Sequence, residues 1–367
     1  MKYFIKTYGC AMNTADSGRM AVGLEAQGYS RASKMSGADL IIINTCSVRQ
    51  KAEDKVYGLA NKIAELRIKK KELRVILTGC FVGSATGERR RIKLTELQRR
   101  MPWVDEFVSL EELVNTSALC SAEVFDEKRK IKEPALVPVM RGCDQFCTYC
   151  VVPYGRGPVR SRPVEEVIEE VKCLVERGTK WVTLLGQSIN DYKTKNSFVE
   201  LLRKVHGVHG LEKISMLSLN PWNFSDELIE VLALPKFKRY VHLPVQSGDD
   251  GILKQMNRPY TVAKYKNLVK KVREKIPGVR IGTDAMVGFP SETEEQFQNT
   301  VKLFEELKFE NAFILIYSER PGTAAAKLYK DNVPLVEKKR RHKVLTQVYK
   351  KARPCKSPNH AFLASIC

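Results

Sequence analysis

Short apolar runs alternate with amphipathic stretches along most of this 367-residue chain. A continuous run such as Leu40–Ile43, bounded by polar residues, is typical of a strand that is buried on both faces of a parallel sheet. Parallel strands need a crossover connection, and an amphipathic helix is the usual one. The alternation therefore predicts an α/β fold built on parallel sheets.

The alternation divides into two regions. In residues 1–118 we expect an open parallel α/β sheet domain of four strands, with helices near residues 14–27 and 49–69. The expected strands are Tyr3–Tyr8, Leu40–Ile43, Arg74–Thr78 and Glu106–Val108. Residues 119–134 are rich in charge and end in a proline, which indicates a linker.

The second region, residues 135–352, repeats the strand–helix pattern six times. Because a complete barrel of this kind has eight units, we expect a partial (βα)6 barrel. Its predicted strands are Leu136–Met140, Trp181–Leu185, Ile214–Leu219, Tyr240–Val245, Val279–Val287 and Phe313–Tyr317. Residues 353–367 show no periodicity and are predicted to form an irregular tail.

The chain is strongly basic, with 62 Lys and Arg against 42 Asp and Glu and a formal charge of +20. Such an excess favours a polyanionic partner, of which nucleic acid is the commonest. The excess is densest in Lys338–Lys343, and further basic runs occur at Lys69–Lys71, Arg89–Arg91 and Arg99–Arg100. A single run can be a solvated helix face, whereas several runs together favour a nucleic-acid footprint.

Ten cysteines occur in a chain whose first residues, Met1–Lys6, lack the apolar stretch of a signal peptide. Apolar residues make up 43% of the chain, which is enough to bury cores and excludes a disordered protein. No apolar run reaches the roughly 20 residues that a membrane span needs. We therefore expect a cytoplasmic protein without a membrane partner. Its thiols are expected to serve metal or redox chemistry and not to form disulfides. We also expect the protein to be a monomer.

Cys143, Cys147 and Cys150 form a Cys-x3-Cys-x2-Cys motif directly after a predicted strand, and we call them the first triad. Three thiolates on one loop can hold three irons of a [4Fe–4S] cluster, and no fourth cysteine follows at ferredoxin spacing. The fourth iron would be open to a small chelating ligand such as S-adenosylmethionine. Zinc fits less well, because it takes four ligands and no histidine lies nearby. Three incidental buried cysteines are the remaining alternative.

Cys10, Cys46 and Cys80, the second triad, each follow the C-terminal end of a separate predicted strand. Loops at those ends converge on one crevice of an open α/β sheet, so the three cysteines can meet. This predicts a second three-cysteine site that again leaves one iron open. Alternatively, each cysteine packs as a small buried hydrophobic residue. No ligand role is assigned to the other cysteines, Cys120, Cys173, Cys355 and Cys367.

The spacing of the first triad resembles the radical S-adenosylmethionine (radical SAM) superfamily. The longer string Cys147–Gly157, followed by Ser161–Pro163, is similar to the methylthiotransferase family within it. Further matches to that family are Lys6–Asn13, Asn44–Arg49, Thr78–Cys80, Leu184–Asn190, His242–Gly248, Val287–Thr293 and Tyr317–Thr323. The resemblance extends from residue 2 to about residue 350.

The resemblance implies two [4Fe–4S] clusters and S-adenosylmethionine as cofactors. The cluster on the first triad would reduce S-adenosylmethionine to methionine and a 5′-deoxyadenosyl radical, with electrons from a donor such as flavodoxin or ferredoxin. The cluster on the second triad would hold the sulfur, which a second S-adenosylmethionine methylates. Tyr149, Arg162, Gln187 and Gln246 are the implied cofactor contacts, and Gly288 is expected to let the backbone approach the cofactor closely.

Substrates implied by the family are isopentenyladenosine in tRNA, threonylcarbamoyladenosine in tRNA and an aspartate of a ribosomal protein. The strings Val151–Tyr154, Ser161–Pro163 and Asn44–Arg49 look most like the isopentenyladenosine branch. That branch implies methylthio insertion at C2 of the modified adenosine in the anticodon loop of tRNA, and the basic excess also favours RNA.

The family normally carries a small all-β RNA-binding module, the TRAM module, after the barrel, and this chain is expected to lack it. A tRNA methylthiotransferase is the first hypothesis. A cluster-bearing RNA-binding protein whose turnover is impaired without that module is the alternative of a different class.

Overall fold

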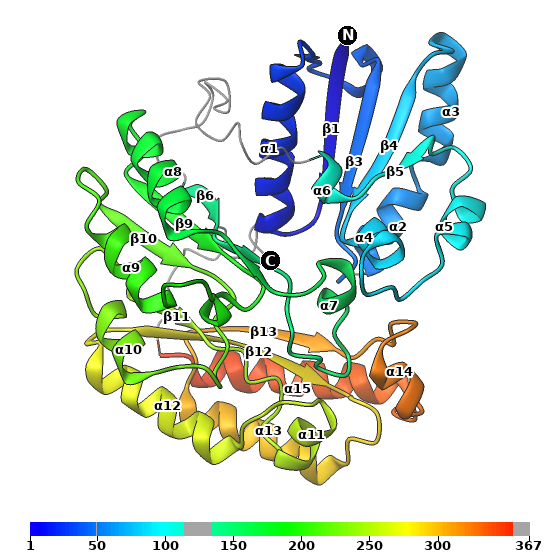
Figure 1. The fold of residues 1–367 in the computed structure, drawn as a ribbon. Coiled ribbons are helices and arrows are strands. Elements are labelled where there is room, and N and C mark those ends of the chain that lie inside the picture. Colours follow the sequence, from blue (N-terminus) through cyan, green and yellow to red (C-terminus); the bar gives the residue numbers. More distant parts are fainter. Residues whose placement is uncertain (49, 114–133, 355–367) are drawn as a thin grey trace.

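The computed structural model describes residues 1–48, 50–113 and 134–354. They form two α/β units that lie side by side, an N-terminal parallel sheet and a curved sheet covered by helices (Figure 1). The α/β class expected from the sequence is confirmed. The expected linker up to residue 133, the tail from residue 355, and Cys120, Cys355 and Cys367 lie outside the described residues, so the domain boundaries stay a prediction.

The N-terminal unit is a five-stranded parallel sheet with the strand order β2-β1-β3-β4-β5. Its strands are β1 (Lys2–Tyr8), β2 (Ser30–Arg31), β3 (Leu40–Thr45), β4 (Arg74–Gly79) and β5 (Glu106–Phe107). Its helices are α1 (Ala11–Ala26), α2 (Gln50–Tyr57), α3 (Ala60–Lys69), α4 (Cys80–Thr86), α5 (Leu94–Arg100) and α6 (Leu110–Leu113). The order reverses between β1 and β3, and in doubly wound sheets such a switch point marks the crevice where ligands bind.

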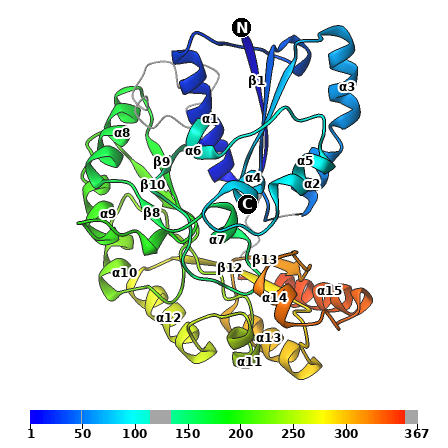
Figure 2. The ribbon, with the colours of Figure 1, turned by 45° about the vertical axis from the view of Figure 1, so that its right-hand side comes forward.

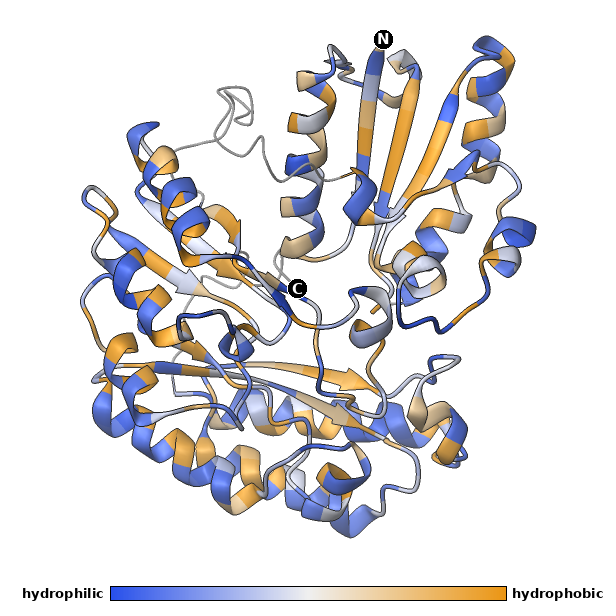
Figure 3. Ribbon diagram, viewed as in Figure 1, coloured by the Kyte–Doolittle hydropathy of each residue, from blue (hydrophilic) through white to orange (hydrophobic). Residues whose placement is uncertain are grey.

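The central strand β3 shows why its sequence is apolar throughout. Ile41 and Ile43 pack in the core that covers one face of the sheet together with residues of α2–α5. Leu40 and Ile42 pack on the other face with residues of α1. Because successive side chains of a strand point to opposite faces, a strand with helices on both sides needs apolar residues at every position. Figure 3 shows this concentration of apolar residues on the central strands.

One helix expected over residues 49–69 is instead two helices, α2 and α3, so that expectation was wrong. The interruption falls at Gly58 and Leu59. Glycine in a helix interior costs about 1 kcal/mol relative to alanine, which favours a break there. The apolar spacing continues across the break, because Val56 and Ile63 pack in the same core. That continuity explains why the sequence pattern resembles one helix.

The second unit is a curved layer of six strands, made of the parallel sheets β10-β9-β6 and β11-β12-β13. Main-chain hydrogen bonds of Ile214 to Lys236 and Lys238 join β10 to the segment that enters β11. The strands are β6 (Ala135–Pro138), β9 (Trp181–Leu185), β10 (Lys213–Met216), β11 (Tyr240–His242), β12 (Arg280–Val287) and β13 (Asn311–Ile316). This is the partial (βα)6 barrel expected from the sequence.

Helices cover the outer face of this curved layer (Figure 2). They are α8 (Val164–Glu176), α9 (Phe198–His206), α10 (Asp226–Leu232), α12 (Val262–Lys275), α13 (Glu294–Leu307) and α15 (Leu335–Ala352). The short helices α11 (Asp250–Gln255) and α14 (Ala324–Leu328) instead contact the loop after β7, where Thr148 hydrogen-bonds the Gln255 carbonyl and the N–H of Ala325. None of the helices formed by residues 1–48, 50–113 and 134–354 is long and apolar enough to cross a membrane.

The strand expected over Leu136–Met140 is divided in the structure. β6 ends at Pro138, which has no N–H to extend the ladder. Met140 belongs to a separate strand, β7 (Met140–Arg141), which pairs antiparallel with β8 (Arg160–Ser161). The loop between β7 and β8 contains the first triad and the short helix α7 (Val152–Gly155). The β7–β8 pair therefore fixes both ends of the segment that carries the predicted cluster ligands.

The basic run on α15 is partly structural. Lys338 is 4% exposed, and its Nζ lies 2.6 Å from Asp331 Oδ2 and 5.0 Å from the centre of the Tyr317 ring. A Cβ at position 288 would lie 2.4 Å from Cγ of Lys338, so Gly288 makes room for this lysine. Lys338 therefore anchors α15 to the barrel, whereas the neighbouring Lys339 is exposed.

We expect the substitution Lys338→Met to lower the free energy of unfolding by about 2 kcal/mol, since Asp331 loses its charged partner. The matched substitution Lys339→Met should change it by less than about 0.5 kcal/mol, as is usual for exposed positions. Urea denaturation followed by circular dichroism measures both values. Equal effects of the two substitutions would contradict an anchoring role for Lys338.

Candidate cluster site between the two units

The second triad lies at the carboxyl ends of three adjacent strands. Cys10 follows β1, Cys46 follows β3, and Cys80 opens α4 directly after β4. The thiols of Cys46 and Cys80 hydrogen-bond each other, and Cys10 is close enough to Cys46 to influence its ionisation. The fold thus brings together three cysteines that are far apart in sequence, beside the switch point of the sheet. Their role as ligands stays a prediction.

Two buried asparagines fix the geometry of the second triad. Asn13 Nδ2 donates to Asn44 Oδ1 at 3.0 Å, and Asn44 Nδ2 donates to the Asn13 carbonyl oxygen at 2.8 Å. Asn13 Oδ1 also accepts the backbone N–H of Cys10 at 3.4 Å. Asn13 lies in the first turn of α1, just after Cys10, and Asn44 lies in β3, two residues before Cys46. These bonds therefore tie the start of α1 to the end of β3.

The loop of the first triad is held by both units. Thr148, inside the motif, donates its N–H to the Met256 carbonyl at 3.1 Å and accepts the N–H of Ala325 at 2.7 Å. From the N-terminal unit, Arg89 Nη1 donates to the carbonyl oxygen of Cys143 at 3.0 Å. Cys143 is 8% exposed. The three thiols are therefore carried on a loop whose backbone is fixed on two sides.

A partly buried arginine that the sequence pattern does not single out faces the first triad. Arg258 Nη1 lies 3.5 Å from Cys147 Sγ, and its Nη2 donates to the Pro244 carbonyl at 2.7 Å. Its guanidinium stacks over the Trp222 ring at 4.8 Å. The contact places a fixed positive charge beside sulfurs that would be thiolates in a cluster. Arg258 belongs to an unremarkable segment far from the motif, so no local sequence signal marks it.

The protein environment shifts the pKa values of the thiols in different directions. Burial raises the pKa of Cys143 to about 11 and raises the pKa of Cys150 as well. In the second triad, the hydrogen bond from Cys46, helped by the Arg156 guanidinium, lowers the pKa of Cys80 to about 6 in spite of burial. The same hydrogen bond, together with burial, raises the pKa of Cys46. Since cluster ligands must be deprotonated, loading the sites with iron would release protons.

The short helix α7 lies between the two triads. It begins two residues after Cys150 and packs against α4, whose first residue is Cys80 (Figure 2). Arg156, which follows α7, has Nε 3.0 Å from Cys80 Sγ and Nη1 2.5 Å from Asp16 Oδ2. Its side chain is 5% exposed. One continuous segment therefore carries the first triad and donates a hydrogen bond to the second.

α4 and α7 approach each other at two glycines. A Cβ on Gly83 would lie 2.3 Å from the Gly155 carbonyl oxygen, and a Cβ on Gly155 would lie 2.7 Å from the Cys80 carbonyl oxygen. Both distances are shorter than real side chains adopt, so a larger residue at either position must push the helices apart. The spacing of the two units at the triads thus depends on these glycines.

For Gly83→Ala we expect the free energy of unfolding to fall by about 1–3 kcal/mol, because the added methyl forces α4 and α7 apart. Iron retained by the second triad should fall as well. Gly18→Ala is the control, since Gly18 lies within α1 and nothing lies within 4 Å of its Cβ position. That substitution should stabilise the protein by up to about 1 kcal/mol. Urea unfolding and iron analysis test the pair, and a neutral Gly83→Ala would contradict the close-contact argument.

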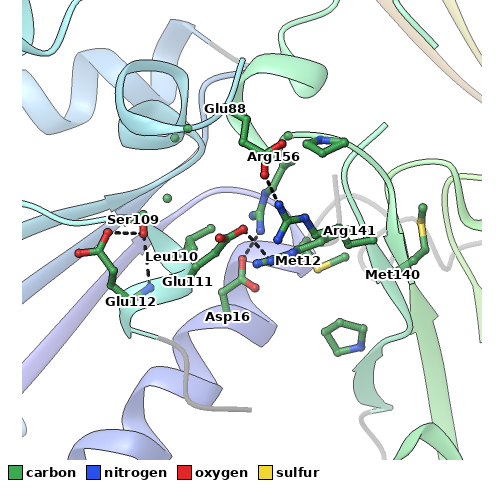
Figure 4. A pocket seen from close by; sticks show the side chains of 18 of the residues that line it. Met12, Asp16, Glu88, Ser109, Leu110, Glu111, Glu112, Met140, Arg141 and Arg156 are labelled. Carbon is green, nitrogen blue, oxygen red and sulfur yellow. Dashed lines mark hydrogen bonds and ion pairs between the residues drawn. The ribbon is translucent and has the colours of Figure 1, made fainter. Parts of the chain in front are cut away.

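A cavity of about 590 Å³ also lies between the two units (Figure 4). Its arginines are paired with acidic residues, in the pairs Arg19–Glu170, Arg141–Glu111, Arg156–Asp16, Arg160–Glu88 and Arg162–Glu170. The lining contains none of the six triad cysteines, all of which the structure describes. This polar cavity therefore lies beside the candidate cluster site and is not the site itself.

Two of the predicted cofactor contacts lie directly at the first triad. Gln187 Oε1 accepts the backbone N–H of Gly142 at 2.6 Å, next to Cys143. Tyr149 lies inside the motif and packs beside Phe289 and neighbouring apolar side chains, and burial raises its pKa. Their contact with S-adenosylmethionine stays a prediction.

The other two predicted contacts are placed differently. Gln246 follows β11, has a φ of 68°, and donates its N–H to the Asp284 carbonyl at 2.8 Å. A positive φ at a residue other than glycine is strained, and such strain often marks functional sites. Arg162 lines the polar cavity between the two units. There its Nη1 donates to the Pro138 carbonyl at 2.7 Å and pairs with Glu170 at 2.6 Å. The structure thus does not bring Arg162 to the first triad.

The donor set fits iron–sulfur clusters better than a single metal ion. Across the described parts of the chain, no group of three or more His, Cys, Asp or Glu side chains is close enough to hold one ion. A [4Fe–4S] cluster binds each thiolate through a different iron, so its ligands stand further apart than those of one ion. Each triad offers three thiols and one adjacent arginine, Arg258 or Arg156, for an anionic cluster.

Comparison with known proteins first identifies the class of enzyme to which this chain belongs. Residues 137–304 match the Radical SAM superfamily, and residues 2–105 match the family described as Uncharacterized protein family UPF0004. The radical SAM methyltransferase TsrM from Kitasatospora setae has a similar fold, with a TM-score of 0.61 at 15% identity, over 89% of this chain and 77% of TsrM. The cobalamin-dependent radical enzyme OxsB has a TM-score of 0.57 at 12% identity, over 96% of this chain and 57% of OxsB. The fold and the first triad define a radical SAM enzyme.

Curated relatives then give the family. Several relatives are named tRNA-2-methylthio-N(6)-dimethylallyladenosine synthase. The one from Thermotoga petrophila is 41% identical to this chain, over 96% of this chain and 82% of the relative. The one from Dictyoglomus thermophilum is 42% identical, over 92% of this chain and 80% of the relative. A relative of the same name in Clostridium botulinum is 38% identical, over 95% of this chain and 81% of the relative. This chain belongs to the tRNA-2-methylthio-N(6)-dimethylallyladenosine synthase family of radical SAM methylthiotransferases.

Proposed function

We propose that this protein is a tRNA methylthiotransferase that inserts a methylthio group at C2 of isopentenyladenosine next to the anticodon. The observation that carries the proposal is the pair of three-cysteine sites, one in each unit, joined by α7 and the hydrogen bond from Arg156 to Cys80. The names of relatives about 40% identical over most of the chain support this substrate.

Each triad would hold one [4Fe–4S] cluster, and together with S-adenosylmethionine the clusters supply the radical and the sulfur for insertion into a C–H bond. The protein's part is to hold these groups and the target base within reach of one another and to keep water away. The fixed loop of the first triad and the close contact of α4 with α7 provide that rigidity.

Charged and polar side chains would complete both sites. Arg258 and Arg156 donate hydrogen bonds to Cys147 and Cys80, and such bonds stabilise thiolate ligands. We propose that S-adenosylmethionine is contacted by Tyr149, Gln187 and Gln246. Arg162 is also proposed as a contact, and it would have to leave its ion pair with Glu170 to act as one.

The proposed partner is the anticodon loop of a tRNA, because an unpaired loop base can be splayed out into a deep site. Exposed cations such as Lys339 and Lys343 of α15 can contact phosphates, whereas the buried Lys338 and Arg341 cannot. A one-electron donor such as flavodoxin or ferredoxin is the second proposed partner.

Anaerobic reconstitution with iron and sulfide, followed by nucleoside mass spectrometry of tRNA, tests the function. Incubation with S-adenosylmethionine, dithionite and tRNA that carries isopentenyladenosine should give the 2-methylthio nucleoside. Formation of 5′-deoxyadenosine without that nucleoside would overturn the proposal. Product on threonylcarbamoyladenosine tRNA instead would reassign the substrate within the family.

A further inference from the structure

One arginine of the barrel reaches the loop of the second triad. Arg320 follows β13, and its side chain is 7% exposed. Its Nη2 donates to the Ser47 carbonyl at 2.7 Å and pairs with Glu53 Oε1 at 2.5 Å. Ser47 directly follows Cys46. A side chain of the barrel therefore fixes the backbone beside one predicted ligand of the second cluster.

A second arginine makes the reverse connection. Arg91, from the N-terminal unit, donates through Nη1 to the Pro321 carbonyl at 2.6 Å and through Nη2 to Ser47 Oγ at 2.9 Å. Gly322 has a φ of 83°, and a Cβ there would lie 2.4 Å from Cγ of Arg91. Glycine adopts this conformation without strain and leaves room for the arginine. Ser47 is thus held by one arginine from each unit, through its carbonyl and through its hydroxyl.

The same barrel segment also binds the loop of the first triad. We call residues 320–325 the inter-triad strap. Thr323, which is buried, caps α14 and donates its hydroxyl to the Arg320 carbonyl at 2.8 Å. Two residues further on, the N–H of Ala325 donates to the Thr148 carbonyl at 2.7 Å. Because Thr148 lies inside the motif of the first triad, the inter-triad strap joins the loops of both triads.

The two arginines share one carboxylate. Glu53 pairs with Arg320 and lies 3.9 Å from Arg91 Nη2, and within the described residues neither guanidinium pairs with another acidic side chain. The side chains of Arg91 and Glu53 are 3% and 9% exposed. One positive charge is therefore buried in excess beside the second triad, and burying an unbalanced charge is costly. A [4Fe–4S] cluster with three thiolate ligands is anionic and would balance this charge.

We propose that Arg320, supported by Arg91, is a positioning residue that sets the distance between the clusters held by the two triads. This inference rests on the proposed function, in which sulfur held at the second triad meets the substrate radical formed at the first. The inter-triad strap joins the two loops that would hold these groups. A displacement of about 1 Å between reacting groups can cost about 100-fold in rate. The strap therefore serves the transfer of sulfur, whereas cleavage of S-adenosylmethionine needs the first triad alone.

Arg320→Met and Arg91→Met test this role separately. Each variant leaves Glu53 paired with the other arginine, so neither strands a buried carboxylate. The matched control is Arg273→Met. Arg273 Nη2 likewise donates to a main-chain carbonyl at 2.7 Å and lies 3.8 Å from Glu310 Oε2. Glu310 directly precedes β13, so this contact lies at the end of the barrel opposite to the first triad.

The decisive measurement is the magnetic interaction between the two reduced clusters, observed by electron paramagnetic resonance of the reconstituted full chain after reduction with dithionite. This interaction is the part of the signal that disappears when either triad is replaced by alanine. In Arg320→Met and in Arg91→Met it should differ at least twofold from the parent, whereas Arg273→Met should match the parent. When the first triad is also replaced, the second triad should still bind about four irons, because its three cysteines remain.

Nucleoside mass spectrometry gives the second readout. Arg320→Met and Arg91→Met should form 5′-deoxyadenosine within threefold of the parent, but at least tenfold less methylthio nucleoside for each 5′-deoxyadenosine. A parent-like magnetic interaction in both variants would overturn the proposal. Loss of iron from the second triad would also overturn it, because Arg320 would then retain the cluster and not position it. Equal changes in Arg273→Met would assign the effect to stability and overturn it too.

Failure of this inference is distinguishable from failure of the proposed function. The magnetic interaction is measured without tRNA and without S-adenosylmethionine. It therefore tests the positioning role of Arg320 even where the parent protein forms no methylthio nucleoside.

Discussion

Replacing Cys143, Cys147 and Cys150 together by alanine is expected to abolish formation of 5′-deoxyadenosine and to remove about half of roughly eight irons bound per reconstituted chain. Without these thiols, the loop next to Arg258 would offer no ligand to an iron–sulfur cluster. Replacing Cys10, Cys46 and Cys80 together should also remove about half of the iron. In that variant S-adenosylmethionine cleavage should continue while the methylthio nucleoside is lost. Iron analysis, electron paramagnetic resonance and nucleoside mass spectrometry measure these results.

The control for both triple variants is Cys173→Ala. Cys173 lies on α8, away from both triads, and its removal should leave the iron content unchanged. Only about four irons in the parent protein would contradict the two-cluster interpretation. Loss of S-adenosylmethionine cleavage in the Cys10, Cys46, Cys80 variant would contradict the division of roles between the triads.

The features of the fold that could be predicted are those that the order of apolar and polar residues within one short segment determines. Leu40–Ile43 could be predicted as a buried strand because helices on both faces require apolar residues at every position. The meeting of Cys10, Cys46 and Cys80 could be predicted because each follows a strand, and parallel strands end at one edge of the sheet. These inferences need no knowledge of distant contacts.

The contacts that join the two units could not be predicted in this way. Arg320 of the barrel donates to the Ser47 carbonyl at 2.7 Å and pairs with Glu53 at 2.5 Å, directly beside Cys46. Arg258 reaches Cys147 from a segment with no motif. Each pairing depends on how two units pack, and an isolated arginine carries no periodicity that reveals its partner.

The basic run on α15 and the glycine at position 288 both have a structural role that the sequence does not reveal. The basic run on α15 suggested an RNA footprint, yet Lys338 is buried against Asp331 and Tyr317. Gly288 is expected to let the backbone approach the cofactor closely, and the structure shows that its missing side chain also makes room for Lys338. Charge and glycine patterns show that a position is special, but whether the neighbour is a ligand or a side chain depends on tertiary packing.

The substitution Arg156→Met should lower the free energy of unfolding by about 3–5 kcal/mol, because Asp16, 8% exposed, would be left as an unpaired charge in the interface. Arg160→Met is the control from the same segment. Its ion pair with Glu88 joins side chains that are about half exposed, so its loss should cost less than about 1 kcal/mol. Urea denaturation of the apoproteins measures both values.

The double variant Arg156→Met, Asp16→Asn isolates the cause. If the cost of Arg156→Met comes from the stranded carboxylate, removing that charge should recover at least half of the lost stability, as a double-mutant cycle would show. Arg156 also donates to Cys80 Sγ, so both variants should bind less iron at the second triad even where stability is recovered. Recovery of stability without recovery of iron would separate the two contacts of this one guanidinium. A double variant no more stable than Arg156→Met would instead mean that the loss comes from packing of the buried side chain against α4 and α7, and not from the charge of Asp16.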